Sequence, residues 1–69
     1  MVWIKRDFYI ETEDQKYQIW RCKSRWILEQ AQPYYQYEMY IDDVYRVIGK
    51  FHTLKQAKIF AEWYNKKGE

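Results

Sequence analysis

Cysteine, proline, glycine and histidine are all scarce in this 69-residue chain, which contains one, one, two and one of them. Because Cys22 is the only cysteine, an intrachain disulfide is excluded, and a lone thiol is more typical of a reducing compartment than of secretion. No apolar run approaches the roughly 18 residues of a membrane-spanning helix, and residues 1–6 lack the apolar segment of a signal peptide. We therefore expect a cytoplasmic protein with no membrane partner.

Residue types that carry catalysis are equally sparse. His52 is the only histidine, so a multi-histidine metal site cannot form, and Ser24 is the only serine and lies within a predicted strand. No glycine-rich loop is present to bind a phosphate, and Cys22 is predicted to be buried and inert. The carboxylates fall at predicted turns, where they favour local backbone hydrogen bonds; they are Glu11, Glu13 and Asp14, and Asp42 and Asp43. They indicate a metal site or an acid–base pair only weakly, and we predict a non-enzymatic protein with no metal and no cofactor.

Charge of one sign is also lacking, whereas aromatic residues are abundant. The net charge is +2, which favours neither a DNA mimic nor a strongly basic nucleic-acid-binding protein. Aromatic residues make up 22% of the chain. A small sheet with one covered face cannot bury all of them, so we expect some to be exposed and available to a partner.

The pattern of residues predicts one α+β domain spanning residues 1–69. Runs of Tyr, Trp, Ile and Val with period-two alternation predict strands. We expect strands at residues 2–11, 16–28 and 34–41, and a fourth that ends near Phe51; the connections are a tight turn at 12–15, a loop at 29–33 and a turn at 42–43. The predicted fold is a three- or four-stranded antiparallel sheet with one C-terminal helix packed on one face.

The C-terminal helix has the clearest signal. Thr53 is a good N-cap, because its hydroxyl can accept a hydrogen bond from the first turn, and Gly68 can end the helix. One arc of the helix is apolar and has two small residues at its centre, which allow a close approach to the sheet; it consists of Leu54, Ala57, Phe60, Ala61 and Tyr64.

Alternation also predicts which side chains face the helix. In the second strand Arg21, Lys23 and Arg25 share one parity, and three charges cannot all face a core. We therefore expect these three to face solvent and Trp20, Cys22, Ser24 and Trp26 to face inward. In the first strand we expect Val2, Ile4, Phe8 and Ile10 to point inward, and in the third strand Tyr35, Tyr37, Met39 and Ile41. The open face of the sheet should then carry Trp3, Tyr9, Tyr17, Ile19, Arg21, Lys23, Arg25, Tyr40 and Arg46.

This open face is the candidate binding surface. Its mixture of cations and rings suits a nucleic acid, because cations meet phosphates and rings stack on bases. The same mixture suits a protein partner, since Trp, Tyr and Arg dominate interface hot spots, and it is also compatible with a simple solvated face. The residues that we single out for partner or nucleic-acid binding are Arg21, Lys23, Arg25, Tyr40 and Arg46.

Ile59 and Trp63 form a second candidate surface. They lie one helical turn apart and outside the apolar arc, so they widen the apolar side of the helix. They either cover an edge strand or the loop at 29–33, or make a contact with a partner or a second copy in a homodimer.

The run from Gly49 to Ala57, Gly-Lys-Phe-His-Thr-Leu-Lys-Gln-Ala, resembles a strand-to-helix junction of small phage and mobile-element proteins. It is similar to that of the arm-type or AP2-like N-terminal domains of tyrosine-family integrases. The resemblance implies a sheet that enters the DNA major groove, with Arg21, Lys23, Arg25, Gln36 and Arg46 contacting bases or phosphates. A free-standing chain of this type resembles a phage accessory factor that binds and blocks or redirects a host component.

Two hypotheses about function follow. The leading one is a non-catalytic interaction protein, a phage-encoded inhibitor or adaptor that binds a host protein. The alternative is a module that binds DNA or RNA through the basic and aromatic sheet face.

Overall fold

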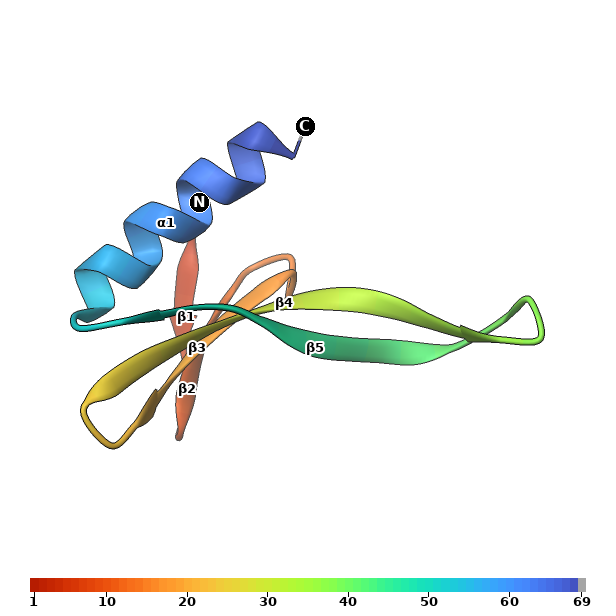
Figure 1. Ribbon diagram of the computed structural model, residues 1–69, viewed down its shortest axis with the longest axis horizontal. Coiled ribbons are helices and arrows are strands. Elements are labelled where there is room, and N and C mark those ends of the chain that lie inside the picture. The colour runs from red at the N-terminus through yellow and green to blue at the C-terminus, as the bar shows by residue number, and fades with distance from the viewer. Residues whose placement is uncertain (69) are drawn as a thin grey trace.

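The computed structural model describes residues 1–68 and shows a five-stranded antiparallel sheet with one helix at its C-terminal end (Figure 1). The elements are β1 (Trp3–Lys5), β2 (Tyr9–Thr12), β3 (Tyr17–Cys22), β4 (Arg25–Gln36), β5 (Met39–Phe51) and α1 (Leu54–Lys67). The strands lie in the sheet in chain order. The α+β class and the C-terminal helix are confirmed, whereas the predicted number of three or four strands is wrong.

The strand boundaries differ because two predicted strands fold back on themselves, while the predicted strand at 34–41 is divided between β4 and β5. Residues 2–11 form β1 and β2, and the turn between them is closed by a 2.8 Å hydrogen bond from the Arg6 N–H to the Tyr9 carbonyl. Residues 16–28 form β3 and the start of β4, with Lys23 in the left-handed region at φ 57°. Neither turn contains glycine or asparagine, the residues that favour such backbone, so the sequence pattern did not indicate them.

The predicted loop at 29–33 and the predicted turn at 42–43 are both wrong, because these residues belong to strands. Pro33 of β4 pairs with Asp43 of β5 in one long hairpin. The chain reverses instead at Tyr37 and Glu38, which have φ values of 53° and 65°. Two consecutive positive φ values are typical of the two-residue hairpin turn whose twist matches that of the strands.

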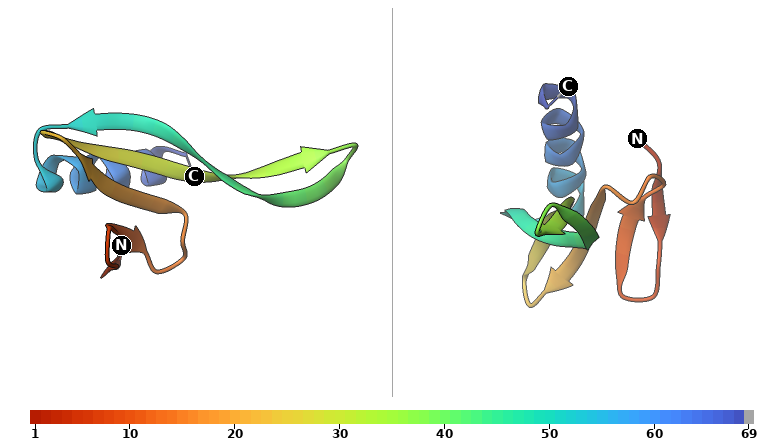
Figure 2. Two further views of the ribbon diagram at one scale, coloured as in Figure 1. Left: turned by 90° about the horizontal axis from the view of Figure 1, so that it is seen from below. Right: turned by 90° about the vertical axis from the view of Figure 1, so that its right-hand side faces the viewer.

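Helix α1 covers one face of the sheet at the end where β3, β4 and β5 lie together (Figures 1 and 2). The buried cluster contains Tyr17, Ile19, Leu28, Ala57 and Ala61. Because the two alanines are fully buried, the helix backbone lies close to the strands. The predicted apolar arc is confirmed, since Leu54, Phe60 and Tyr64 pack against this cluster. The predicted cap is also present, with the Thr53 hydroxyl accepting from the Gln56 N–H at 3.1 Å.

The predicted orientation of the β3 side chains is reversed. Tyr17 and Ile19 are 2% and 0% exposed beneath the helix, whereas Cys22, which we expected inside, is exposed. The parity argument failed because the three cations do not share one strand: Arg21 lies in β3, Lys23 in the turn and Arg25 in β4. Arg21 has the same parity as Ile19, and its guanidinium lies over the Trp26 ring, 5.6 Å from the ring centroid.

The orientation of the N-terminal residues is also partly reversed. Trp3, which we expected on the open face, packs against the core. Ile10 also packs against the core, as we expected. Phe8 and Val2, which we expected inside, are 89% and 58% exposed. Phe8 is displaced from the sheet because it lies in the turn between β1 and β2.

Candidate protein-interaction arm

Strands β4 and β5 extend well beyond the rest of the sheet (Figures 1 and 2). The last residue of β4 that pairs with β3 is Gln30, which lies opposite Tyr17. From Gln32 to Val44, therefore, the hairpin is only two strands wide. We call residues 32–44 the arm. It contributes to the longest dimension of the molecule, 39 Å, and no helix covers either of its faces (Figure 2).

The arm exposes a continuous series of large apolar and aromatic side chains. The exposed ones are Tyr34, Tyr35, Tyr37, Met39, Tyr40, Ile41 and Val44. Its ionisable groups besides tyrosine are Glu38, Asp42 and Asp43, and it contains no lysine, arginine or histidine. Exposed apolar surface of this extent usually marks an interaction site, and here it is accompanied by negative charge alone.

Contacts near the tip hold two of the tyrosines in place. The rings of Tyr35 and Tyr40, which face each other across the hairpin, meet edge to face with centroids 5.9 Å apart. The Tyr40 hydroxyl donates to the Asp43 carboxylate at 3.1 Å. This hydrogen bond raises the pKa of Tyr40, because it favours the protonated phenol. The arm therefore presents ordered rings.

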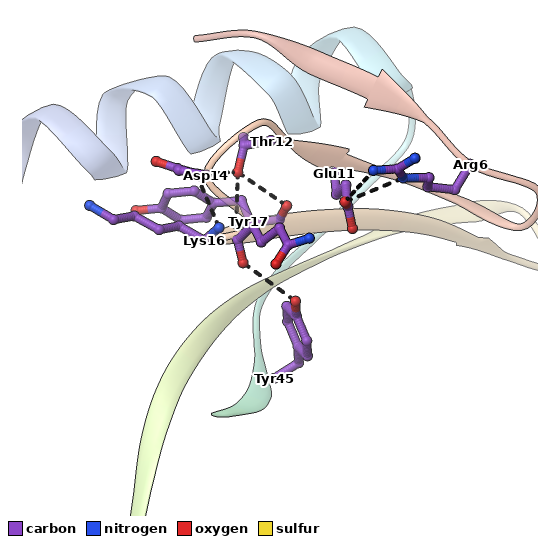
Figure 3. A network of polar contacts seen from close by, with 8 residues as sticks. Arg6, Glu11, Thr12, Asp14, Lys16, Tyr17 and Tyr45 are labelled. Atoms are coloured by element: carbon purple, nitrogen blue, oxygen red, sulfur yellow. Dashed lines mark hydrogen bonds and ion pairs between the residues drawn. The ribbon is translucent and has the colours of Figure 1, made fainter. Parts of the chain in front are cut away.

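The base of the arm is attached to the rest of the sheet through polar contacts. Arg46 donates to the Gln32 side-chain oxygen at 3.2 Å, and the Tyr45 hydroxyl donates to the Gln15 carbonyl at 3.4 Å. Partial burial raises the pKa of Tyr45. Figure 3 shows this contact beside the turn that follows β2. The Tyr45 contact thus connects the base of the arm to the turn that follows β2.

That turn is itself held by a compact network (Figure 3). The Thr12 hydroxyl donates to the Asp14 carboxylate at 2.7 Å, and the Lys16 N–H donates to the same oxygen at 3.1 Å. Donation by Thr12 is the main reason that the pKa of Asp14 lies below its usual value. Beside it, Arg6 forms an ion pair with the nearly buried Glu11 at 3.1 Å. Asp14 therefore has the turn-forming role that we predicted, whereas Glu11 lies in β2 and Asp42 and Asp43 lie in β5.

The five residues predicted as one binding face do not lie together. Arg21, Lys23 and Arg25 lie at the β3–β4 turn, whereas Tyr40 lies on the arm and Arg46 at its base. Tyr40 lies opposite Tyr35, ten residues from Arg25 along β4 and roughly 33 Å away at the usual strand rise, and Arg46 lies opposite Gln30, about halfway between them. No single partner surface of ordinary size is centred on all five.

The three cations at the β3–β4 turn form a small basic end. Arg25 lies 2.6 Å from the His52 ring nitrogen, and the Arg21 guanidinium donates to the Lys23 carbonyl at 3.2 Å. A cleft of about 470 Å³ lies beside this end, between the β1–β2 hairpin and the start of α1. Its lining includes Trp3, Trp26, Lys5, Arg21 and Lys58.

Ile59 and Trp63 flank the edge strand β5 but do not cover it, since they remain 56% and 53% exposed. They line an open apolar groove of about 480 Å³, together with Lys50, Phe51, His52, Gln56 and Phe60. The Trp63 ring packs on Phe60 on one side, and the Lys67 ammonium lies 4.9 Å from its centroid. We call this surface the helix groove.

Sequence reasoning missed the arm because it placed a loop at 29–33 and a turn at 42–43, which divided the hairpin. It also directed four side chains toward the core that are exposed on the arm, which is wrong because no helix covers them: Tyr35, Tyr37, Met39 and Ile41. A signal was nevertheless present. No lysine or arginine occurs between Arg25 and Arg46, and five of the eight tyrosines lie in that interval. Such a segment departs sharply from the mixed charge of the rest of the chain.

Comparisons with protein-family models, with curated proteins and with solved structures found no match to this chain. Within residues 1–68 no helix is both long enough and apolar enough to cross a membrane. The same residues bring together no group of three His, Cys, Asp or Glu side chains that could hold a metal ion.

Proposed function

We propose that this chain is a non-catalytic protein-binding module that presents the arm to a partner protein. The observation that carries the proposal is the surface of the arm, where seven large apolar or aromatic side chains are exposed beside three carboxylates and no cation. Tyrosine and methionine are enriched at protein interfaces, and tyrosine supplies contact area at a low cost in conformational entropy.

The charge of the arm favours protein over nucleic acid as its partner. Glu38, Asp42 and Asp43 would repel phosphates, whose neutralisation by Lys and Arg supplies most nucleic-acid affinity. A complementary partner would instead offer an apolar surface rimmed by Lys or Arg. As a phage accessory factor, the protein would act by blocking or redirecting the host protein that it binds; inhibitor or adaptor is the functional class that we propose.

Quantitative affinity purification with matched variants tests this proposal. In Tyr37→Ala/Met39→Ala the two side chains at the tip, 89% and 67% exposed, are removed without touching the core. We expect this variant to lose one specific host protein that the wild type and a Lys55→Ala control retain, and calorimetry with that protein should show binding weakened at least about tenfold. If every captured protein is retained equally by the arm variant, the arm is not the binding surface.

Nucleic acid is a second candidate, supported by the basic end alone. Arg21, Lys23 and Arg25 are exposed there beside Trp26, which is the combination of cations and a ring that single strands favour. Fluorescence anisotropy with labelled DNA and RNA at low and moderate salt tests it. Binding that falls steeply with salt and is abolished by Arg21→Glu/Lys23→Glu/Arg25→Glu would favour this candidate. Absence of binding at low salt would remove it.

A further inference from the structure

The sheet has two outer strands, and they differ greatly in length. Strand β1 has three residues, whereas β5 has thirteen and pairs only with β4. A long unpaired edge exposes a row of backbone donors and acceptors, which is a template for another strand. Soluble proteins usually protect such an edge. The unpaired edge of β5 is therefore a candidate site for pairing with another strand.

Within the arm, β4 also has a free edge, but Pro33 blocks it. The Ala31 N–H donates to the Lys16 carbonyl at 2.7 Å, so it points away from β5. Alternate residues of a strand direct their N–H groups to the same side. The nitrogen of Pro33 therefore points to the free edge of β4, where it has no hydrogen to donate. Strand addition is thus disfavoured on β4 and remains available on β5.

The same alternation identifies the outward groups of β5. Ala31 pairs with Tyr45 and Pro33 pairs with Asp43, so the backbone groups of Tyr45 and Asp43 point to the outer edge. In the single chain, the Asp43 N–H donates a hydrogen bond to the Asp42 carboxylate at 2.8 Å. Between Asp42 and Val47 the pairing with β4 is regular, because the two register shifts lie outside this segment.

The charges on this regular segment are self-complementary. When two β5 strands run antiparallel with Val44 opposite Val44 of the second copy, Asp42 of each lies opposite Arg46 of the other. Beyond the regular segment, Lys50 of one copy comes toward the turn of the other copy that contains Glu38. A shift of two residues in one direction sets Asp43 opposite Asp43, and a shift of four in the other sets Arg46 opposite Arg46. The register about Val44 therefore pairs Arg46 with a carboxylate and avoids these like-charge contacts.

We propose that two copies of this chain form a two-fold dimer in which their β5 strands pair antiparallel about Val44, joining the two sheets into one. This inference goes beyond the proposed function and does not depend on it. The two helices lie on the same face of the joined sheet and at opposite ends. Pairing along this edge leaves the side chains of each arm away from the tip uncovered by the second copy, so a further partner can still contact them.

The dimer also accounts for the helix groove. This register brings the arm tip of one copy, with Tyr37 and Met39, toward the end of β5 in the other copy, where Gly49 and Phe51 lie. Phe51 lines the helix groove with Ile59 and Trp63. The most exposed apolar side chains of each arm tip therefore arrive at the exposed apolar groove of the second copy. Glu38 arrives at Lys50, which also lines that groove.

A charge swap tests the register. Sedimentation equilibrium of the wild type should give twice the 8.8 kDa chain mass. Arg46→Asp places a carboxylate opposite Asp42 of the second copy, and it should weaken the dimer at least about tenfold. The Asp42→Arg/Arg46→Asp double variant restores the pairing and should restore the dimer. Lys55→Asp, on the solvated side of α1, is the control with the same change of charge.

A monomeric wild type at concentrations of about 0.1 mM would overturn the proposal, as would a dimer that Arg46→Asp leaves unchanged. Circular dichroism of each variant shows whether the fold is retained. If Arg46→Asp dissociates the dimer but the double variant does not restore it, the proposed register is wrong.

Disulfide trapping tests the same register directly. In the proposed dimer, Val44 of one copy lies opposite Val44 of the other in a pair that is not hydrogen-bonded. The two Cα atoms of such a pair lie about 4.5 Å apart, which is within the range for a disulfide. In a Cys22→Ser background, Val44→Cys should form a covalent dimer rapidly under mild oxidation. Gln32→Cys, at the paired position on β4, should not. Equal rates for the two cysteines would contradict the proposal.

Discussion

At the scale of single residues, the network around Asp14 makes stability depend on pH. The hydrogen bond from Thr12 and the backbone N–H of Lys16 lower the pKa of Asp14 in the folded state. A lowered folded-state pKa stabilises the fold at pH values above the unfolded pKa of about 4, and this contribution is lost as the pH falls through the folded value. We therefore expect the wild type to be more stable than Asp14→Asn at pH 7.

Urea unfolding of both proteins at pH 7 and at about pH 2.5 measures this contribution. The free energies of unfolding should converge at the lower pH, where the carboxyl of the wild type is protonated. Asparagine keeps an oxygen that can accept the same hydrogen bonds, so the comparison isolates the charge. A difference between the two proteins that is the same at both pH values would show that the charge of Asp14 is irrelevant to stability.

At the scale of secondary-structure elements, the cap of α1 is the interaction most easily isolated. The Thr53 hydroxyl accepts from the Gln56 N–H at 3.1 Å, and the helix has no acidic residue in its first turn that could replace it. Thr53→Ala should lower the free energy of unfolding by about 1 kcal/mol. Thr53→Ser keeps the hydroxyl and should lie within a few tenths of a kcal/mol of the wild type, as measured by urea unfolding.

The elements also show which parts of the structure could be predicted from the sequence. Helix α1 was predictable because its signals are local: a capping threonine, alanines at helical spacing and a terminal glycine. The hairpins were not, because the chain turns at Lys23 and at Tyr37–Glu38 with positive φ and without the residues that favour it. Tertiary packing accounts for the turn at Lys23, because it places Ile19 and Leu28 opposite each other beneath the helix.

The residues of the candidate sites were likewise predictable only where the signal is local. Ile59 and Trp63 were predicted as exposed candidates because helical periodicity alone excludes them from the apolar arc. Tyr40 was predicted to be exposed, and it is, but its neighbours on the arm could not be identified once the hairpin had been divided in the prediction. The basic residues were correctly expected to be exposed, yet their separation from Tyr40 depends on the length of β4, which no local pattern indicates.

At the scale of the whole molecule, the arm and the body should be energetically separable. The core cluster and the side chains packed against it come from the body, and none of them lies in residues 32–44. Replacing residues 35–41 with Asn-Gly joins Tyr34 to Asp42, which already face each other, through a favoured two-residue turn. Because none of the removed residues packs on the core cluster, the shortened chain should fold with a stability within about 1 kcal/mol of the monomeric wild type.

Protein concentration separates the contribution of the arm to folding from its contribution to association. Dimerisation stabilises the folded state by mass action, so the urea midpoint of the wild type should rise with concentration. The shortened chain keeps Asp42, Val44 and Arg46 but lacks Glu38, Met39 and the tip tyrosine Tyr37, so its midpoint should rise less steeply with concentration. At the lowest concentration the two midpoints should approach each other, and the shortened chain should sediment as a weaker dimer than the wild type. A shortened chain that is unfolded at every concentration would show instead that the arm is part of the folding unit.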